Sequence, residues 1–403
     1  MKIAVGLSGG VDSSVVALML KEAGHDVVGI TMRLWREGRY RGGDRAACFG
    51  PNEENSIAQA ADFAKAIGIE HRVFDCFEEY DGEIIRYFRE ASLMGLTPNP
   101  CVICNAEIKF GLLPRVARKC GLQFERFATG HYARIERCEN GRYAVCRAAD
   151  EKKDQSYFLY RLSQEQLAGT MFPLGGMTKV EVRELAAAKG LSTADRLDSQ
   201  DFYSGDKNEL IGEADREGEI VDLSGKVLGR HSGFWRYTVG QRKGIGVYGP
   251  EPHYVIRLDA CRNQVVVGSR KEAFKHEFEV KDMKWMASAP AVEAVPCRVK
   301  IRSTGAPLGP VVLENGTCRA EGEGLFGVAP GQSAVFYDDF GRIICGGVIA
   351  PLRVASQSIR ICQTVCHPLS GGSVAFRIGS MVGSVQHTAL NSTAYDTQLT
   401  KEG

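Results

Sequence analysis

The sequence predicts an α/β protein whose N-terminal part is a doubly wound parallel sheet and whose second half is rich in β-strands. Through about residue 195, segments with helical periodicity alternate with short apolar strands, the pattern of a parallel sheet covered by helices. From Trp235 onward, short β-type runs are broken by glycines. A glycine-rich segment, Gly6–Ser14, follows the first strand directly, where open sheets of this class bind their ligands.

The individual elements are assigned from apolar runs and from helical periodicity. The N-terminal strands are Lys2–Val5, Val27–Met32, His71–Asp75 and Phe127–Gly130. The helices are Val11–Lys21, Glu54–Ile67, Glu79–Met94, Ile108–Lys119 and Lys179–Lys189. The β-type runs of the second half are Tyr254–Leu258, Gln264–Gly268, Cys297–Arg302, Gly331–Tyr337 and Ile343–Ile349.

Composition bounds the class of protein. With 403 residues, 44% hydrophobic and 25% charged, the chain has room for two or three domains. Its net charge is +1, so any nucleic-acid surface has to be a local patch. No apolar run is long enough to span a bilayer and the first strand leaves no room for a signal, so we expect no membrane partner and a cytoplasmic location. The 13 cysteines are expected to be mostly reduced thiols.

The stretch from residue 351 to 403 differs from the rest because it is rich in Ser and Thr and carries few charges. We expect an appended, partly disordered tail. Cys362, Cys366 and His367 lie in it, but two thiols and one imidazole lack the fourth ligand of a structural zinc site. We therefore expect no metal there.

Gly6–Ser14 has the composition of a phosphate-binding loop. Gly9 and Gly10 allow the backbone to approach an anion closely, and the N-terminus of the following helix favours negative charge. Further hydroxyl donors come from Ser8, Ser13 and Ser14. No Lys follows the second glycine, so this is not the loop that grips a terminal phosphate for transfer. It resembles the PP-loop of ATP pyrophosphatases, and that resemblance implies that Asp12 helps to hold Mg²⁺.

The segment Asn99–Gly111 places two thiols, Cys101 and Cys104, three residues apart on a loop that begins with Pro100 and leads into a helix. A helix N-terminus and Lys109 both favour the thiolate, so we expect these thiols to gain acidity. A lone Cys-x-x-Cys leaves three roles open: a nucleophile or sulfur carrier, a redox disulfide, or part of an iron–sulfur or zinc site.

Three further motifs lie at positions suited to binding. Ala128–Ala133 runs from a strand end into a glycine turn, and its His131 is as well explained by structure as by function. Lys152–Phe158 is a basic loop before an aromatic run, suited to RNA contacts. Arg236–Gly244 combines cations and glycines with an aromatic residue, as a phosphate contact or an ordinary charged turn does.

Together these motifs resemble the tRNA-specific 2-thiouridylase family, over Lys2 to about Ile349. The residues that carry the resemblance are Ser8–Ser13, Asn99-Pro100 with Cys104-Asn105, Thr129–Tyr132, Lys153–Leu159, Ser199–Asp201, Gly240–Gly244 and Pro330–Gln332. The family's architecture implies a PP-loop domain at 1–200, a central domain with tRNA contacts at 201–275, a C-terminal β-barrel at 276–350, and the tail at 351–403.

The resemblance also implies a reaction and its residues. ATP and Mg²⁺ adenylate the C2 oxygen of the wobble uridine of tRNA, and sulfur then displaces AMP. The implied ATP contacts are Gly6, Leu7, Ser8, Gly9, Gly10, Val11, Asp12, Ser13, Met32 and Gly130. The implied tRNA contacts are Asn99, Pro100 and Cys101 around the target base, and Lys153, Asp154, Gln155, Arg302 and Ser303 elsewhere. Cys104 matches the family's nucleophile.

The chain departs from the family pattern where the sulfur is handled. Tyr203 stands where familiar members have the cysteine that carries the persulfide, and Cys101 stands where they have Asp. Two mechanisms follow: Cys101 and Cys104 divide the sulfur chemistry as neighbouring thiols, or they ligate a 4Fe–4S cluster with Cys48 as third ligand. The sulfur donor is a cysteine desulfurase, a relay protein or sulfide. Ser303 also departs, replacing a Tyr of the tRNA-contact run.

Two other functions stay open at this stage. One is a PP-loop enzyme that adenylates a small molecule, although it would have no use for the cysteine segment Asn99–Gly111. The other is a tRNA-binding protein that has lost thiolation, which the replacement at Tyr203 makes worth testing.

Overall fold

The computed structural model describes residues 1–191, 201–291 and 293–351. All of them belong to one compact unit, Met1–Ala355. Ser199 and Gln200 of the family motif lie outside the described residues, as do residues 352–403 of the expected tail.

The N-terminal part is built on a parallel sheet with strand order β4-β2-β1-β5-β8 in the described residues. Its strands are β1 (Lys2–Gly6), β2 (Asp26–Arg33), β4 (Glu70–Asp75), β5 (Arg126–Ala128) and β8 (Thr170–Met171). The chain moves from β1 outward to β2 and β4, and later returns to the other side of β1 at β5. The carboxyl ends of β1 and β5 therefore form the switch point at which such sheets bind ligands.

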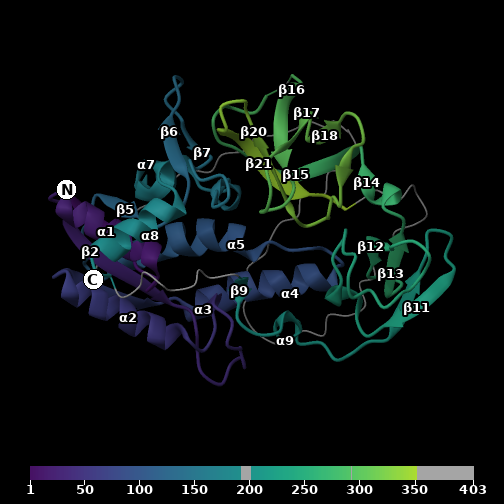
Figure 1. Ribbon diagram of the computed structural model, residues 1–403, viewed down its shortest axis with the longest axis horizontal. Coiled ribbons are helices and arrows are strands. Elements are labelled where there is room, and N and C mark those ends of the chain that lie inside the picture. Colours follow the sequence, from purple (N-terminus) through teal and green to yellow (C-terminus); the bar gives the residue numbers. More distant parts are fainter. Residues whose placement is uncertain (192–200, 292, 352–403) are drawn as a thin grey trace, which may run out of the picture. The chain divides into compact units, whose positions relative to one another are not determined.

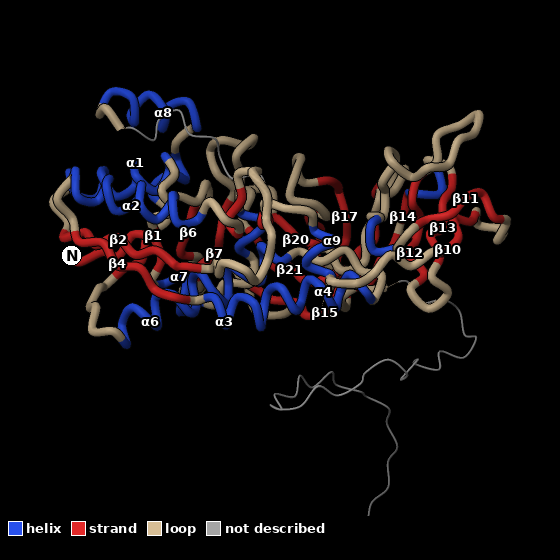
Figure 2. Tube along the Cα trace, turned by 90° about the horizontal axis from the view of Figure 1, so that it is seen from below, coloured by secondary structure: helices blue, strands red, loops and turns tan. Residues whose placement is uncertain are grey.

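Helices cover both faces of this sheet, which confirms the doubly wound prediction (Figure 2). One face is covered by α1 (Val11–Glu22), α2 (Glu53–Ala66) and α8 (Lys179–Ala188). The other packs against α3 (Phe77–Tyr80), α4 (Arg86–Leu93), α5 (Pro100–Ile103) and α6 (Leu113–Lys119). The core strands are buried on both sides, as their continuous apolar runs require.

Two helical segments differ from their predicted form. The segment from Phe77 to Leu93 is α3 and α4 joined by a π-helical turn, Asp81–Ile85. Pro100 starts a helix that continues from α5 through the π-helical stretch Cys104–Leu112 into α6. The predicted loop around Cys101 is therefore wrong: Pro is well accommodated in the first turn of a helix, so the helix begins earlier.

The second half contains β-structure of two kinds (Figure 1). An open sheet has the order β11-β10-β13-β12, from β10 (Gly218–Val221), β11 (Val227–His231), β12 (Tyr254–Asp259) and β13 (Gln264–Gly268). A closed barrel follows, which confirms the C-terminal barrel. Its strands are β15 (Glu277–Trp285), β16 (Val295–Lys300), β17 (Leu308–Glu314), β18 (Thr317–Ala320), β20 (Ser333–Tyr337) and β21 (Ile343–Ile349).

The remaining elements are short. Three strand pairs form, between β3 (Ala47–Phe49) and β9 (Asp201–Tyr203), β6 (Arg134–Arg137) and β7 (Tyr143–Cys146), and β14 (Phe274–Lys275) and β19 (Leu325–Phe326). The remaining helices are α7 (Gln164–Ala168) and α9 (Lys207–Ile211), with 3₁₀ turns at Ser156–Leu159, Pro173–Gly176, Phe234–Arg236 and Lys271–Ala273. No helix of the described residues is long and apolar enough to cross a membrane.

Candidate active site

The phosphate loop connects β1 to α1 and is held by its own hydroxyl groups. The Ser13 hydroxyl accepts a hydrogen bond from the Ser8 N–H (3.2 Å) and donates to the Gly10 carbonyl (3.1 Å). Gly9 has a φ of +71°, a left-handed conformation that favours glycine. Of the other predicted ATP contacts, Leu7 and Val11 are buried and fix the loop to the core. The helix N-terminus thus faces the loop, as an anion site requires.

Asp12, in the first turn of α1, is the acidic centre of this loop. Lys179 places its Nζ 2.7 and 2.8 Å from the two carboxylate oxygens, and the Tyr132 hydroxyl donates to Oδ1 at 2.8 Å. The Lys179 side chain is 8% exposed and that of Asp12 26%. The sequence analysis missed Lys179, although one signal was available: a lysine at the first position of a helix opposes the helix dipole.

Gly130 follows β5 and closes the loop from the other side of the switch point. A Cβ on Gly130 would lie 2.9 Å from the Asp12 Cβ and 3.0 Å from the Ser13 nitrogen, so only glycine allows this approach. Met32, half-buried near the end of β2, lies toward the same carboxyl edge of the sheet. The ATP contacts implied by the resemblance therefore converge on one edge.

Next to Gly130, His131 is a structural histidine. Its Nδ1 lies 2.8 Å from the Thr129 hydroxyl, and its ring packs against those of Phe110 and Phe172, which also contact each other. Burial lowers the pKa of His131 well below its usual value, and the charge of Lys109 lowers it further. The imidazole is therefore neutral at pH 7.

Three cysteines come from two segments that influence each other electrostatically. Cys101 lies in α5 and Cys104 in the π-helical stretch that follows, while Cys48 lies on β3. Charge on Cys48 raises the pKa of both other thiols, and all three raise the pKa of the buried Tyr80. The three thiols are therefore within electrostatic reach of one another.

The expected gain in acidity of Cys101 and Cys104 is wrong. Burial raises the pKa of each thiol to about 12, and the charge of Lys109 only partly opposes it. The desolvation of a thiolate outweighs the helix N-terminus and one cation, because each of those acts at a distance. Within the described residues, no group of three or more His, Cys, Asp or Glu side chains is arranged to hold a metal ion.

Tyr203, at the position of the missing cysteine, belongs to the core. It is fully buried, donates its hydroxyl to Glu209 and accepts a hydrogen bond from the Gly42 N–H at 3.0 Å. Its strand β9 pairs in parallel with β3, with Tyr203 opposite Phe49. This pairing brings β3, and Cys48 with it, beside the segment that carries the second cysteine in familiar members.

The basic loop Lys152–Phe158 is hydrogen-bonded to Tyr132, next to the predicted ATP site. The Gln155 N–H donates to the Tyr132 carbonyl, and the Tyr132 N–H donates to the Gln155 side chain, each at 2.9 Å. Lys153 is half-buried and its N–H donates to the Asp150 carbonyl at 3.1 Å. Because Tyr132 also contacts Asp12, the loop and the nucleotide site share one residue.

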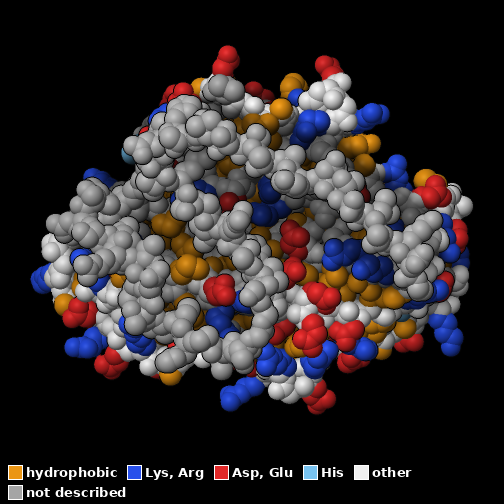
Figure 3. Space-filling model, turned by 180° about the vertical axis from the view of Figure 1, so that it is seen from behind, with side chains coloured by type: hydrophobic (Ala, Val, Ile, Leu, Met, Phe, Trp, Pro, Cys, Tyr) orange, Lys and Arg blue, Asp and Glu red, His pale blue; other side chains and the backbone are white. Residues whose placement is uncertain are grey.

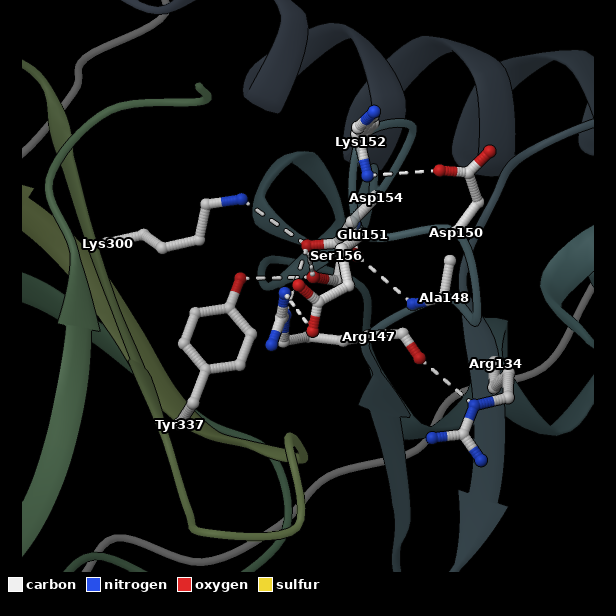
Figure 4. Close-up of polar contacts among 10 residues, drawn as sticks. All are labelled: Arg134, Arg147, Ala148, Asp150, Glu151, Lys152, Asp154, Ser156, Lys300 and Tyr337. Atoms are coloured by element: carbon white, nitrogen blue, oxygen red, sulfur yellow. Dashed lines mark hydrogen bonds and ion pairs between the residues drawn. The ribbon is translucent and has the colours of Figure 1, made fainter. Parts of the chain in front are cut away.

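Asp154 of the same loop is buried and not exposed to solvent (Figure 4). Its carboxylate accepts hydrogen bonds from the Ser156 N–H and hydroxyl (3.2 and 3.0 Å) and from Lys300 (3.3 Å). Lys300 and Tyr337 reach this cluster from barrel strands, and the Tyr337 hydroxyl lies 3.1 Å from that of Ser156. A contribution of Asp154 to tRNA binding would therefore act through the loop and the barrel, which it joins.

Arg302 and Ser303 lie just after β16. Ser303 lines a pocket of about 390 Å³ together with Arg147, Lys152 and Lys300. The exposed Arg302 donates to the Gly327 carbonyl at 3.2 Å. A Cβ on Gly240 would lie 2.6 Å from its guanidinium, so the Gly240–Gly244 motif borders Arg302.

The segment before Asn99 and Pro100 is held by the barrel. The Thr97 N–H donates to the Pro330 carbonyl at 2.7 Å, and the Gln332 side chain donates to the Thr97 carbonyl at 3.2 Å. Asn99 is half-buried and Pro100 buried. The Pro330–Gln332 motif thus fixes the segment that leads into the thiol helix, the continuous helical segment Pro100–Lys119 that carries Cys101 and Cys104.

The visible surface has no broad face of a single charge. On the face shown in Figure 3, basic and acidic side chains are interspersed and neither sign dominates the visible part. With a net charge of +1, any contact with phosphates depends on particular clusters of cations.

Comparison with known proteins covers most of the chain. Three family models match: the tRNA methyl transferase HUP domain at residues 1–203, the tRNA methyl transferase PRC-barrel domain at 208–269 and the aminomethyltransferase beta-barrel domain at 275–349. A tRNA-specific 2-thiouridylase from Endomicrobium trichonymphae is 42% identical over 359 residues, 87% of this chain and 99% of the relative. The chain belongs to the tRNA-specific 2-thiouridylase family.

Other members of the family agree. The 2-thiouridylase of a Picosynechococcus strain is 43% identical over 86% of this chain and 98% of the relative, and that of Chloroflexus aggregans 42% over the same shares. Among solved structures, a predicted subunit of tRNA methyltransferase from Methanocaldococcus jannaschii is 19% identical. It covers 46% of this chain and 74% of that chain with a TM-score of 0.29, too low to support any inference.

Proposed function

We propose that this chain is an ATP-dependent tRNA-uridine 2-sulfurtransferase that acts on the wobble uridine, position 34. The C2 oxygen of the uridine attacks the α-phosphate of ATP and pyrophosphate leaves. Sulfur then attacks C2 and AMP leaves, giving 2-thiouridine. Adenylation converts a poor leaving oxygen into a good one, so the enzyme has only to position a soft nucleophile.

One observation carries the proposal: the thiols and the phosphate loop lie near the same site. The π-helical stretch that begins at Cys104 also carries Phe110, whose ring centroid lies 5.5 Å from that of His131, and His131 directly follows Gly130 of the predicted nucleotide site. Adenylation of the C2 oxygen and attack of sulfur on C2 require this proximity. A cytoplasmic location remains a prediction from the sequence.

Asp12 is suited to help hold Mg²⁺. An ionised carboxylate offers about four lone-pair sites, and Lys179 and Tyr132 use three of those of Asp12. One oxygen position is left for a hard cation, which favours carboxylate ligands. When bound, Mg²⁺ would neutralise phosphate charge.

We assign the sulfur chemistry to Cys101 and Cys104. A cysteine desulfurase or relay protein delivers sulfane sulfur to Cys101, and its terminal sulfur attacks C2 while AMP leaves with the C2–O electron pair. The Cys104 thiol then attacks the Cys101 Sγ and gives up its proton to the thiouridine product, as the S–S bond breaks and its electron pair stays on the sulfur now bound to C2. A Cys101–Cys104 disulfide results, which an external dithiol reduces.

The described residues fit a 4Fe–4S cluster less well. Cys48 could supply a third thiolate, and the three thiols lie within electrostatic reach. However, the described side chains include no ready-made group that would hold a metal ion. No step is therefore assigned to iron, and sulfide as the direct donor belongs to that alternative.

Mass spectrometry of tRNA nucleosides tests the assignment. A strain that lacks the gene is complemented with wild type, Cys104→Ser, Cys101→Ser or Cys48→Ser, and with Cys120→Ser as an exposed control. We expect 2-thiouridine to disappear with the first two variants and to persist with Cys48→Ser and Cys120→Ser. Unchanged 2-thiouridine with Cys104→Ser would overturn the chemistry.

Iron analysis after anaerobic purification separates the two sulfur mechanisms. Wild-type activity in protein without iron supports the thiol pair. Bound iron and sulfide that are lost with Cys48→Ser would establish the cluster instead. Because Tyr203 replaces the usual second cysteine, one alternative function is a tRNA-binding protein without catalysis. Such a protein would bind tRNA but would release no pyrophosphate from ATP.

A further inference from the structure

We infer that Lys179 is a further residue of the ATP site, whose ammonium binds the phosphates that leave as pyrophosphate. The inference deepens the proposed function and rests on it. None of the motifs that define the phosphate loop includes this lysine, because it lies far along the chain at the first position of α8.

The burial of Lys179 requires an explanation beyond stability. The residue is 6% exposed, and lysines are rarely buried unless they are paired. Its partner is Asp12, which its Nζ contacts through both carboxylate oxygens. A hydrophobic residue could fill such a position at no loss of stability, so a buried pair points to another use of the charge.

The position of the Asp12–Lys179 pair indicates what the charge of Lys179 is used for. Asp12 directly follows the glycines of the phosphate loop, and Ser13 beside it turns its hydroxyl back into the loop. Through its contact with Asp12, the ammonium lies beside the first turn of α1, next to the phosphate loop. Asp12 balances its charge but holds it in place, so the loop gains a positively charged hydrogen-bond donor beside the partial charge of the α1 N-terminus.

The backbone holds Lys179 in place before any ligand binds. Thr178 and Glu181 form a capping box around the start of α8. The Lys179 N–H donates to the Asp150 carboxylate at 3.0 Å, and Asp150 belongs to the loop that carries the predicted tRNA contacts. The helix is thus stabilised despite a cation at its N-terminus, and the ammonium is preorganised toward the loop.

The chemistry of adenylation needs a cation at this place. As the uridine oxygen attacks the α-phosphorus, the bond from that phosphorus to the bridging oxygen breaks and its electron pair stays on pyrophosphate. Negative charge grows on the leaving group, and a fixed ammonium stabilises it more than it stabilises bound ATP. In this arrangement Asp12 is a positioning residue for Lys179 besides its proposed part in holding Mg²⁺.

Nucleotide titration of the full-length protein tests the inference. Wild type, Lys179→Met and Lys179→Arg are titrated with Mg·ATP and with AMP, which lacks the leaving phosphates. We expect Lys179→Met to weaken ATP binding about 10- to 100-fold, the range for a lost charge-assisted hydrogen bond, and to change AMP binding less than about twofold. Lys179→Arg should keep part of the ATP affinity that Lys179→Met loses.

Lys189→Met is the matched control. It removes a lysine of the same helix region that pairs with Glu22 on the surface, at 39% and 49% exposure, and leaves ATP binding unchanged. If Lys179→Met is unstable, Lys179→Gln replaces it, because the amide still donates to Asp12, and its AMP affinity reports an intact site.

The outcomes separate this inference from the proposed function. Equal losses of ATP and AMP affinity would show a merely structural role, and unchanged ATP affinity would overturn the inference outright. Selective loss of ATP affinity together with an absence of tRNA thiolation by wild type would support Lys179 and refute the proposed function.

Discussion

Removing either partner of the buried ion pair between Asp154 and Lys300 should lower stability, but by different amounts. The two side chains are 1% and 2% exposed, and they join the loop after β7 to barrel strand β16. Removing one partner of a buried ion pair costs about 3–5 kcal/mol, because the other charge is left uncompensated. Which partner is removed matters here.

Lys300→Met leaves Asp154 well supported. The carboxylate keeps hydrogen bonds from the Ala148 N–H and from the Ser156 N–H and hydroxyl, and the Arg147 Nε lies 3.7 Å away. We therefore expect a loss near the lower limit, about 3 kcal/mol. Asp154→Leu strands the Lys300 ammonium and removes those three acceptor contacts, so its loss should approach about 5 kcal/mol.

Thermal unfolding followed by calorimetry measures both variants. At about 2–4 °C per kcal/mol for a domain of 150–250 residues, Lys300→Met lowers the melting temperature by about 6–12 °C and Asp154→Leu by more. Arg319→Met, which removes exposed ion pairs to Glu277 and Glu314, should change it by about 4 °C or less. Equal effects of the two core variants, or an Asp154→Leu protein as stable as wild type, would refute the reasoning.

Three other changes test the site and its surroundings. Tyr203→Phe should lower stability by about 1–2 kcal/mol in thermal unfolding, since it removes the hydroxyl bonded to Glu209, and should leave 2-thiouridine levels unchanged. Gly130→Ala should weaken ATP binding at least about tenfold in titration and lower the melting temperature by about 2–12 °C, because its Cβ would lie 2.9 Å from that of Asp12 and such overpacking costs about 1–3 kcal/mol. Burial raises the pKa of Glu53 from 4.5 to about 7, so the stability that its protonated form contributes is complete below pH 4.5 and is lost as the pH rises through 7. Glu53→Gln should therefore flatten the decline in melting temperature over this pH range. A pH profile of melting temperature equal to that of wild type would contradict this assignment.

The thiol helix shows where prediction from the sequence reached its limit. The residues Cys101 and Cys104, their spacing and their place before Lys109 are all visible in the sequence. Their protonation is not, because burial depends on residues from other parts of the chain, and burial raises both pKa values. The sequence indicates Cys48 only by its region, whereas the structure places it on β3, beside β9 and within electrostatic reach of both thiols.

The sequence by itself determined the alternating α/β pattern, the β-rich second half and the phosphate loop, because each depends on periodicity or on a contiguous motif. Only the tertiary structure decided that Lys179 neutralises Asp12, that Asp154 is buried against the barrel, and that the position of the usual second cysteine is filled by core-packed Tyr203. The physical reason is the range of the interactions along the chain. Local conformation follows from neighbours along the chain, whereas desolvation and ion pairing follow from neighbours in space.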